Sequence, residues 1–246
     1  MRPRNKKNLE ARIEAVGEYI EAEPAGKKGT YKKNFRELHV EIGCGKGSFI
    51  CGMAEKNPDI FFIGIECVKN VLVTAAEKAR ALNLGNIVFF NVNAEYLADF
   101  FEEGEIDKIY LNFSDPWPRD KQEKHRLTSN KFLPLYINLL ADKGEIIQKT
   151  DNRPLFDFSL EMYKAYNCEL KRVSFDLHRE PDYNDLGNVV TEYEARFSEQ
   201  GVPICYARVV MPDKSTVAEE VAELLAVIEK RKYFEKLAEK NCSYKT

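Results

Sequence analysis

Residues 41–47 read EIGCGKG and close a short apolar segment at 38–42. Gly43, Gly45 and Gly47 allow the backbone to turn tightly and to approach a ligand without an intervening Cβ. The helical pattern that follows at 48–57 would point its N-terminus at such a ligand. This stretch predicts the first strand–turn–helix unit of an α/β fold that binds a nucleotide, although a plain tight turn is an alternative for the glycines alone.

The same alternation of apolar strands and helical patterns continues along the chain. We expect strands at 38–42, 60–65, 87–91, 106–113, 144–150, 170–175 and 204–211, and helices at 48–57, 68–82, 95–101, 130–140, 154–166 and 191–199. Alternation of this kind predicts a mostly parallel sheet with helices on both faces. The fold class is therefore α/β, with a Rossmann-like, seven-stranded sheet that binds its ligand beyond the carboxyl ends of the strands.

The end of the chain predicts one further element. Residues 216–219 read TVAE, which fits the T-x-x-E capping box, and apolar residues recur behind it at helical spacing. We expect an extra C-terminal helix of roughly 25 residues that covers the sheet or a partner subunit. The chain then divides into a basic N-terminal arm at 1–37, an α/β domain at 38–213 and a helical extension at 214–246.

Length and composition fit one globular domain. The chain has 246 residues, of which 44% are hydrophobic and 31% are charged. No apolar run approaches the roughly 20 residues of a membrane helix, so we expect a cytoplasmic protein without a membrane partner. The six cysteines form no C-x-x-C pair and the three histidines lie far apart, so we expect no metal site.

Positive charge is concentrated in three stretches, although the net charge is −3. Residues 1–12 hold five cations and one acid, residues 26–36 hold five cations and no acid, and residues 119–126 hold four cations and two acids. Because phosphate binding responds to the local field, these stretches predict contacts with a nucleic acid backbone. Solvated surface lysines are the alternative.

Polar residues stand at the ends of the second and third predicted strands. Glu66 ends the segment FFIGIE at 61–66, and Asn93 follows the next strand in NVNA at 91–94. Glu66 could accept two ribose hydroxyls or favour the N-terminus of the next helix, and Asn93 could bind an adenine edge or cap a helix. Together with the glycine turn they predict an adenosine-containing cofactor, either NAD or S-adenosylmethionine.

The fourth predicted strand runs into NFSDPWP at 112–118. Asp115 stands at the strand tip, and Pro116 and Pro118 stiffen the turn around Trp117. A carboxylate beside a rigid aromatic wall suits methyl transfer to a base nitrogen, because a flat ring must be held and oriented. A tryptophan that packs into the core is the alternative. An NAD-dependent oxidoreductase has no need of this segment and would favour G-x-G-x-x-G over G-x-G-x-G.

With these motifs, and with MRPRNK at 1–6, RLT at 126–128, QKTDN at 148–152 and TEYE at 191–194, the chain resembles the bacterial tRNA (guanine-N7)-methyltransferases. The resemblance extends to about Met211. It implies a class I methyltransferase fold, with the catalytic domain at 38–213, that uses S-adenosylmethionine to methylate N7 of guanosine 46 in the tRNA variable loop. The implied partner is tRNA, bound by a monomer or homodimer.

The resemblance also implies roles for single residues. Glu41, Glu66, Asn93 and Asp115 match positions that bind S-adenosylmethionine, beside the three glycines of the turn, and Asp115 is also the implied catalytic residue. The implied substrate-binding residues are Arg119, Asp151, Thr191, Glu192, Tyr193 and Glu194, and the implied RNA-binding residues are Lys121, Lys124 and Arg126. On the residues alone, 191–194 also fits a capping box and Asp151 also fits a turn.

One segment departs from the family pattern. The family usually has lysine at the position of Arg119 and then reads K-R-H-x-K-R-R, where this chain reads DKQEKHR at 120–126. Asp120 and His125 replace cations, so we expect weaker phosphate binding by this loop, with compensation from residues 1–12 and 26–36.

The expected chemistry needs no strong general base. Guanine N7 carries a lone pair and no proton, so it can displace the sulfonium methyl in line while Asp115 stabilises the positive charge that develops on the ring. Two alternatives stay open: methylation of another base atom, such as an adenine amino group, and a non-catalytic subunit that only binds tRNA.

Overall fold

The computed structural model describes residues 8–183, 188–219, 221–223, 226–227 and 230. In this part of the chain one sheet has the strand order β3-β2-β1-β4-β5-β7-β6. Its strands are β1 Glu37–Ile42, β2 Ile60–Ile65, β3 Ile87–Phe90, β4 Ile106–Asn112, β5 Leu140–Thr150, β6 Glu169–Ser174 and β7 Cys205–Val210. Strands β1 to β5 pair in parallel, and β7 lies antiparallel between β5 and β6. The predicted Rossmann-like, mostly parallel sheet is confirmed.

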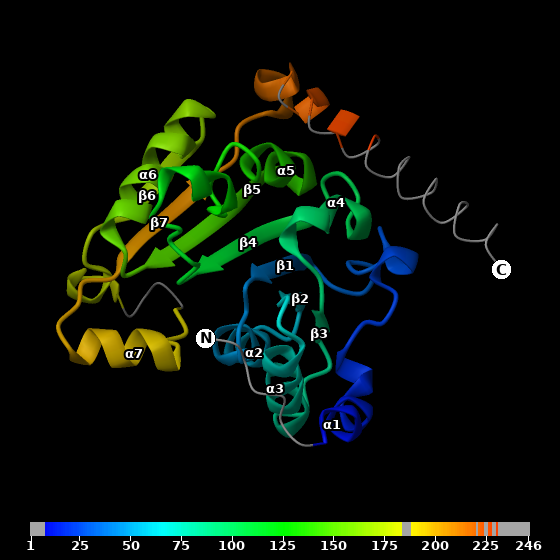
Figure 1. Cartoon of the computed structure of the whole chain (residues 1–246). Coiled ribbons are helices and arrows are strands. Elements are labelled where there is room, and N and C mark those ends of the chain that lie inside the picture. The colour runs from blue at the N-terminus through cyan, green and yellow to red at the C-terminus, as the bar shows by residue number, and fades with distance from the viewer. Residues whose placement is uncertain (1–7, 184–187, 220, 224–225, 228–229, 231–246) are drawn as a thin grey trace.

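Helices cover both faces of this sheet (Figure 1). They are α1 Leu9–Ala15, α2 Ser48–Lys56, α3 Lys69–Ala81, α4 Leu97–Phe100, α5 Leu133–Leu139, α6 Arg153–Ala165 and α7 Glu192–Glu199. Buried side chains of α4, α5 and α6 form one core with one face of the sheet, while α1, α2, α3 and α7 pack against a second core on the opposite face. A sheet buried on both sides explains why its parallel strands read as continuous apolar runs.

Two predicted boundaries differ from the observed ones. Strand β5 begins at Leu140, where the sequence predicts the end of a helix, because Leu140 pairs with Ile106 across an irregular register and Lys143 turns the backbone at φ 59°. The helix predicted at 95–101 is a 3-10 turn at Ala94–Tyr96 followed by the single turn α4. Local apolar spacing does not predict the start of β5, since it depends on pairing with a distant strand.

The predicted capping box at 216–219 is wrong. Asp213 caps this turn instead: its carboxylate accepts a hydrogen bond from the backbone of Ser215 at 2.8 Å, and a 3-10 turn spans Lys214–Val217. Most of the predicted C-terminal helix at 214–246 lies outside the described residues. No helix in the described ranges is both long and apolar enough to cross a membrane.

Candidate functional site

The glycine turn forms the first wall of the site, at the carboxyl end of β1. Gly43 and Gly45 have φ angles of 77° and 57°, and a Cβ added to either would meet nothing within 4 Å. Gly47 differs, because its Cβ would lie 2.7 Å from that of Ala75 on α3. The first two glycines therefore leave open space for a ligand, whereas the third permits close packing of the turn against a helix.

A cavity of about 370 Å³, here called pocket A, lies at the carboxyl ends of β1, β2, β3 and β4. Its lining includes Glu66, Asn93 and Asp115, which the sequence predicts to be cofactor-binding residues. The other lining residues are Ile42, Gly43, Ile65, Cys67, Val92, Ala94, Glu95, Phe113, Ser114, Trp117, His125, Leu127 and Phe132. Adjacent strand ends thus bring the predicted residues together in one cavity.

Two residues of pocket A also hold the local backbone. The Glu66 carboxylate accepts hydrogen bonds from the backbone of Gly45 at 3.2 Å and of Val68 at 2.8 Å. Asn93 caps its turn, since its side-chain oxygen accepts from the backbone of Glu95 at 3.0 Å. The structural interpretations of both residues are correct, and both residues still line the cavity.

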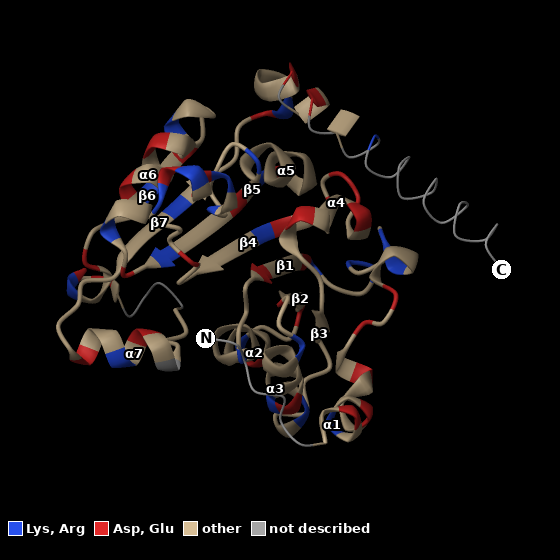
Figure 2. Cartoon of the chain, in the orientation of Figure 1, with Lys and Arg blue, Asp and Glu red and all other residues tan. Residues whose placement is uncertain are grey.

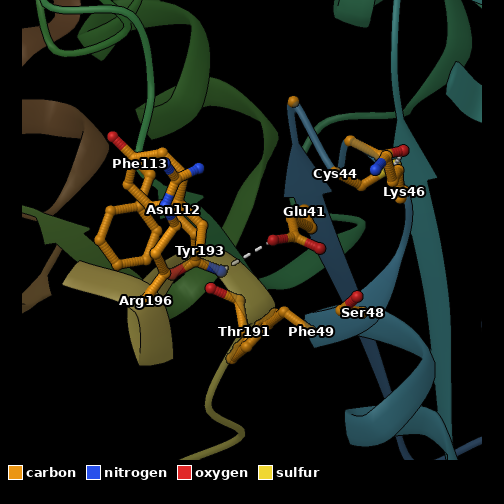
Figure 3. A pocket seen from close by; sticks show the side chains of 12 residues that line it. Glu41, Cys44, Lys46, Ser48, Phe49, Asn112, Phe113, Thr191, Tyr193 and Arg196 are labelled. Carbon is orange, nitrogen blue, oxygen red and sulfur yellow. Dashed lines mark hydrogen bonds between the residues drawn. The ribbon is translucent and has the colours of Figure 1, made fainter. Parts of the chain in front are cut away.

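A second cavity of about 460 Å³, here called pocket B, adjoins pocket A (Figure 3). Gly43 and Phe113 line both cavities, so the two meet there. The other residues that line pocket B are Glu41, Cys44, Gly45, Lys46, Ser48, Phe49, Asn112, Thr191, Tyr193 and Arg196. Helix α7 therefore faces the glycine turn across this cavity, although the two are far apart in the sequence.

Glu41 is the buried acid of pocket B. One carboxylate oxygen accepts a hydrogen bond from the Asn112 side chain at 2.8 Å, drawn as a dashed line in Figure 3. The other oxygen, like the side-chain oxygen of Asn112, is buried without a hydrogen-bond partner in the described part of the chain. Burial raises the pKa of Glu41 to about 7, against the opposing effects of Asn112 and of the positive charge of Lys149. Unused buried acceptors of this kind fit a ligand that brings a donor, such as an ammonium group.

The segment after β4 adopts an unusual backbone conformation. Phe113 and Trp117 have φ angles of 51° and 45°, in the left-handed region that bulky side chains rarely occupy. The Arg126 guanidinium donates to the Trp117 carbonyl at 3.2 Å and lies 4.4 Å from the centre of the Phe158 ring. Arg126, a predicted RNA-binding residue, thus fixes the backbone of this segment at Trp117. Asp115, at the centre of the segment, is exposed.

The TEYE segment contributes to the site unevenly. Thr191 caps α7 by accepting from the backbone of Glu194 at 2.9 Å, and both Thr191 and Tyr193 line pocket B. The Tyr193 hydroxyl donates to Asp151 at 3.3 Å, and its ring centre lies 4.9 Å from that of Phe113. The Glu194 carboxylate is buried and lines neither pocket. The side chain of Glu192 lies outside the described part of the structure.

Other predicted residues lie beside the pockets rather than in them. Arg119, Lys121 and Lys124 are exposed and line neither cavity. Among the described residues no cluster of His, Cys, Asp and Glu could hold a metal ion. Sequence reasoning missed Arg196. It gave no separate role to Lys149 within QKTDN, or to Asn112 and Phe113 within NFSDPWP.

Comparison with known proteins gives one family. A family model described as "Putative methyltransferase" matches residues 36–207. The chain is 47% identical over 204 residues to the tRNA (guanine-N(7)-)-methyltransferase of Streptococcus sanguinis, covering 82% of this chain and 95% of that protein. It is 47% identical over 188 residues to the enzyme of the same name from Bacillus subtilis, covering 76% and 87%.

Solved structures share the fold. The 16S rRNA methyltransferase KamB superposes with a TM-score of 0.56 at 10% identity, covering 74% of this chain and 91% of that one. An antibiotic-related methyltransferase superposes with a TM-score of 0.54 at 20% identity, covering 73% and 89%. At this level of identity, the likeness concerns the architecture of the sheet and its helices alone.

Proposed function

The chain belongs to the bacterial tRNA (guanine-N7)-methyltransferase family, and we propose that it methylates guanosine 46 in the variable loop of tRNA. It is an S-adenosylmethionine-dependent enzyme that acts on a guanine N7 of tRNA. The observation that carries the assignment of the site is the meeting of pockets A and B at Gly43 and Phe113. A methyl donor in one cavity can there reach a base in the other.

Pocket A, together with Glu41 of pocket B, supplies the groups for the cofactor. We assign Glu66 to the ribose hydroxyls and Asn93 to the adenine edge, because both line pocket A at strand ends. Glu41 suits the ammonium of the methionine part, since its unused buried oxygen needs a donor. When bound, S-adenosylmethionine supplies a methyl group on a positively charged sulfur.

The part of pocket B next to α7 supplies the groups for the base. Tyr193 and Phe113 present aromatic rings there, Thr191 presents a hydroxyl at the start of α7, and Asp151 lies within hydrogen-bond distance of Tyr193. Aromatic rings hold an unstacked base by its flat faces, as enzymes that modify single bases require. We assign Arg119, on the exposed loop beyond Trp117, to the phosphate backbone next to that base.

Asp115 is the proposed catalytic residue. Asp115 lines pocket A, two residues after Phe113, which lines both pockets. The guanine ring would gain positive charge there as N7 bonds to the methyl group. A carboxylate there stabilises the transition state more than the ground state. Because N7 has no proton to lose, Asp115 need not act as a base.

The test is methylation of unmodified tRNA by Asp115→Ala, with labelled S-adenosylmethionine and chemical cleavage at N7-methylguanosine. We expect kcat to fall about a hundredfold, the usual cost of removing one preorganised electrostatic group. Asp142→Ala is the matched control, since Asp142 is an exposed acid of β5, outside the 119–126 loop, that lines neither pocket. A rate for Asp115→Ala equal to that of the control would refute the assignment.

The position within tRNA is tested separately with a transcript in which guanosine 46 is replaced by adenosine. We expect no cleavage product from this transcript and full labelling of the unaltered one. N7 cleavage at another guanosine of the altered transcript would refute position 46 while leaving the guanine-N7 activity in place, and label recovered on adenine would favour the amino-group alternative.

A further inference from the structure

A buried ion pair lies directly beneath pocket B. The Lys149 ammonium, on β5, is 2.6 Å from one oxygen of the Glu194 carboxylate, on α7, and the two side chains are 1% and 0% exposed. Burial lowers the pKa of Lys149, and the charge of Glu194 opposes this shift. Such a pair contributes little net stability, because removing both charges from water offsets their attraction. What it does supply is a fixed geometry between the strand and the helix.

Both oxygens of the Glu194 carboxylate already have partners within the protein. One oxygen bonds to Lys149, and the other lies 3.1 Å from the ring nitrogen Nε2 of His178 and accepts from Asn188 at 3.1 Å. The carboxylate is fully buried and lines neither pocket. The resemblance of TEYE to substrate-binding segments implies that Glu194 contacts guanine, but this geometry favours an indirect role.

Lys149 contacts two aromatic residues that line pocket B, although it does not line the pocket itself. Its ammonium lies 4.8 Å from the centre of the Phe49 ring and 5.9 Å from that of Phe113, and both phenylalanines line the pocket. It also donates to the side-chain oxygen of Asn188 at 2.9 Å and to the carbonyl of Val189 at 3.4 Å. A cation with all its donors engaged in this way holds the two rings by cation–π attraction and fixes the chain that leads into α7.

The ion pair therefore sets two residues that face the base. Tyr193 is the neighbour of Glu194 in α7, and Asp151 lies two residues after Lys149. These two are joined by a hydrogen bond of 3.3 Å, and the Tyr193 ring lies 4.9 Å from Phe113. A shift of α7 against β5 would move Tyr193 relative to Phe113. In-line methyl transfer is sensitive to small errors in the orientation of the base, so such a shift would slow the reaction.

We propose that Lys149 and Glu194 are positioning residues that set the aromatic wall of pocket B, formed by Phe113 and Tyr193, for the incoming guanine. Glu194 acts through Lys149 and does not touch the base. The inference rests on the proposed function, because it assigns pocket B to the guanine.

The experiment replaces the pair by apolar side chains of similar volume, in the double variant Lys149→Met/Glu194→Leu. Either single replacement leaves a buried charge unpaired and lowers the melting temperature, whereas the double variant removes both charges together. We expect the double variant to melt near the unaltered protein and to bind S-adenosylhomocysteine within about threefold of its Kd. Its kcat on tRNA falls at least about tenfold, because the base is less well oriented.

A purely structural role predicts the opposite result for kcat. If the pair only stabilises the fold, a double variant that melts near the unaltered protein would have nearly full kcat, and this result would overturn the inference. Lys108→Met is the matched control, since Lys108 lies on β4 in the same sheet, pairs with Glu145 at 3.1 Å and lines neither pocket A nor pocket B. We expect its kcat to stay within about twofold.

A double-mutant cycle tests the route through Tyr193. Tyr193→Ala is made in the unaltered protein and in the double variant. If the pair acts through the aromatic wall, Tyr193→Ala costs at least about threefold less in kcat/KM when the pair is already absent. Equal costs in both backgrounds would overturn the inference. An unaltered protein that methylates no guanine contradicts the proposed function, whereas an active one with a fully active double variant contradicts only this inference.

Discussion

Two basic segments of the chain differ in what their cations contact. In the 26–36 segment, Lys27, Lys32 and Arg36 form ion pairs with Glu21, Asp107 and Asp59, and Lys28 donates to the carbonyl of Ala98. In the 119–126 loop, Arg126 donates to the carbonyl of Trp117, but none of the four cations forms an ion pair with a described acid. The segment with more positive charge in sequence therefore has less charge available to a new partner.

The two segments also lie at opposite ends of the strands, the 26–36 segment at the amino end of β1 and the 119–126 loop beyond the carboxyl end of β4. The 26–36 segment leads into the amino end of β1 and packs beside α4, where Figure 2 shows its blue cations near red acids. The 119–126 loop follows the segment that lines pocket A, and His125 of this loop lies with its ring centre 5.0 Å from that of Trp117. A cation that is already paired with an acid of the protein gains less from a phosphate than an unpaired one, and it releases fewer counterions from the RNA. We therefore expect the loop to bind the tRNA backbone.

The largest expected effect comes from neutralising the loop, in the triple variant Arg119→Gln/Lys121→Gln/Lys124→Gln. The logarithm of the affinity falls as the logarithm of the salt concentration rises, and each phosphate contact adds about 0.7 to 0.9 to the steepness of this fall. The loss of three contacts should therefore make the slope shallower by about 2 to 3. We expect the KM for tRNA to rise about ten- to a hundredfold at low salt. Methylation rates at several salt concentrations measure both quantities, and an unchanged slope would show that these cations are only solvated.

A smaller gain is expected from Asp120→Lys. Asp120 is an exposed acid of the loop and stands between the cations Arg119 and Lys121. Replacing it removes a repulsive charge and adds an attractive one, so the KM for tRNA should fall several-fold at low salt. The gain should disappear at about 1 M salt, where the screening length is about 3 Å. A gain that persists at high salt would point to a specific contact instead of a phosphate interaction.

Ion pairs between residues far apart in the chain also limit what the sequence can predict about the site. Glu66, Asn93 and Asp115 could be placed in one cavity in advance, because the carboxyl ends of neighbouring parallel strands lie side by side. Each residue stands one to three positions beyond the end of its own strand. Lys32 pairs with an acid 75 residues away, and Lys149 with one 45 residues away. No local pattern encodes such pairs.

Backbone conformation sets the second limit. The prolines of NFSDPWP predict a stiff turn, but they do not predict that Phe113 adopts a φ of 51° and becomes a shared wall of two cavities. The packing of α7 opposite the glycine turn likewise depends on how β7 returns between β5 and β6. The gathering of Glu66, Asn93 and Asp115 in pocket A could therefore be predicted from the sequence, whereas the meeting of pockets A and B needed the three-dimensional structure.

The smallest effect on tRNA is expected from the matched change in the other segment, Lys27→Gln/Lys28→Gln/Lys32→Gln. It removes as many charges as the loop variant, so a field set only by total charge would give the same change in slope. Because Lys27 and Lys32 are already neutralised by Glu21 and Asp107, we expect the KM for tRNA to stay within about twofold and the slope to change by less than about 0.5.

Stability should change instead. The carboxylate of Asp107 also accepts from the backbone of Leu38 at 2.8 Å, so Lys32 supports a contact at the start of β1, and its loss should cost less than about 1 kcal/mol, as for other partly exposed pairs. Thermal unfolding of both triple variants measures this difference, with the loop variant expected to melt near the unaltered protein. If the salt slope fell equally in the two variants, the ion pairs of the 26–36 segment would have to open when tRNA binds, and the distinction between engaged and available cations would fail.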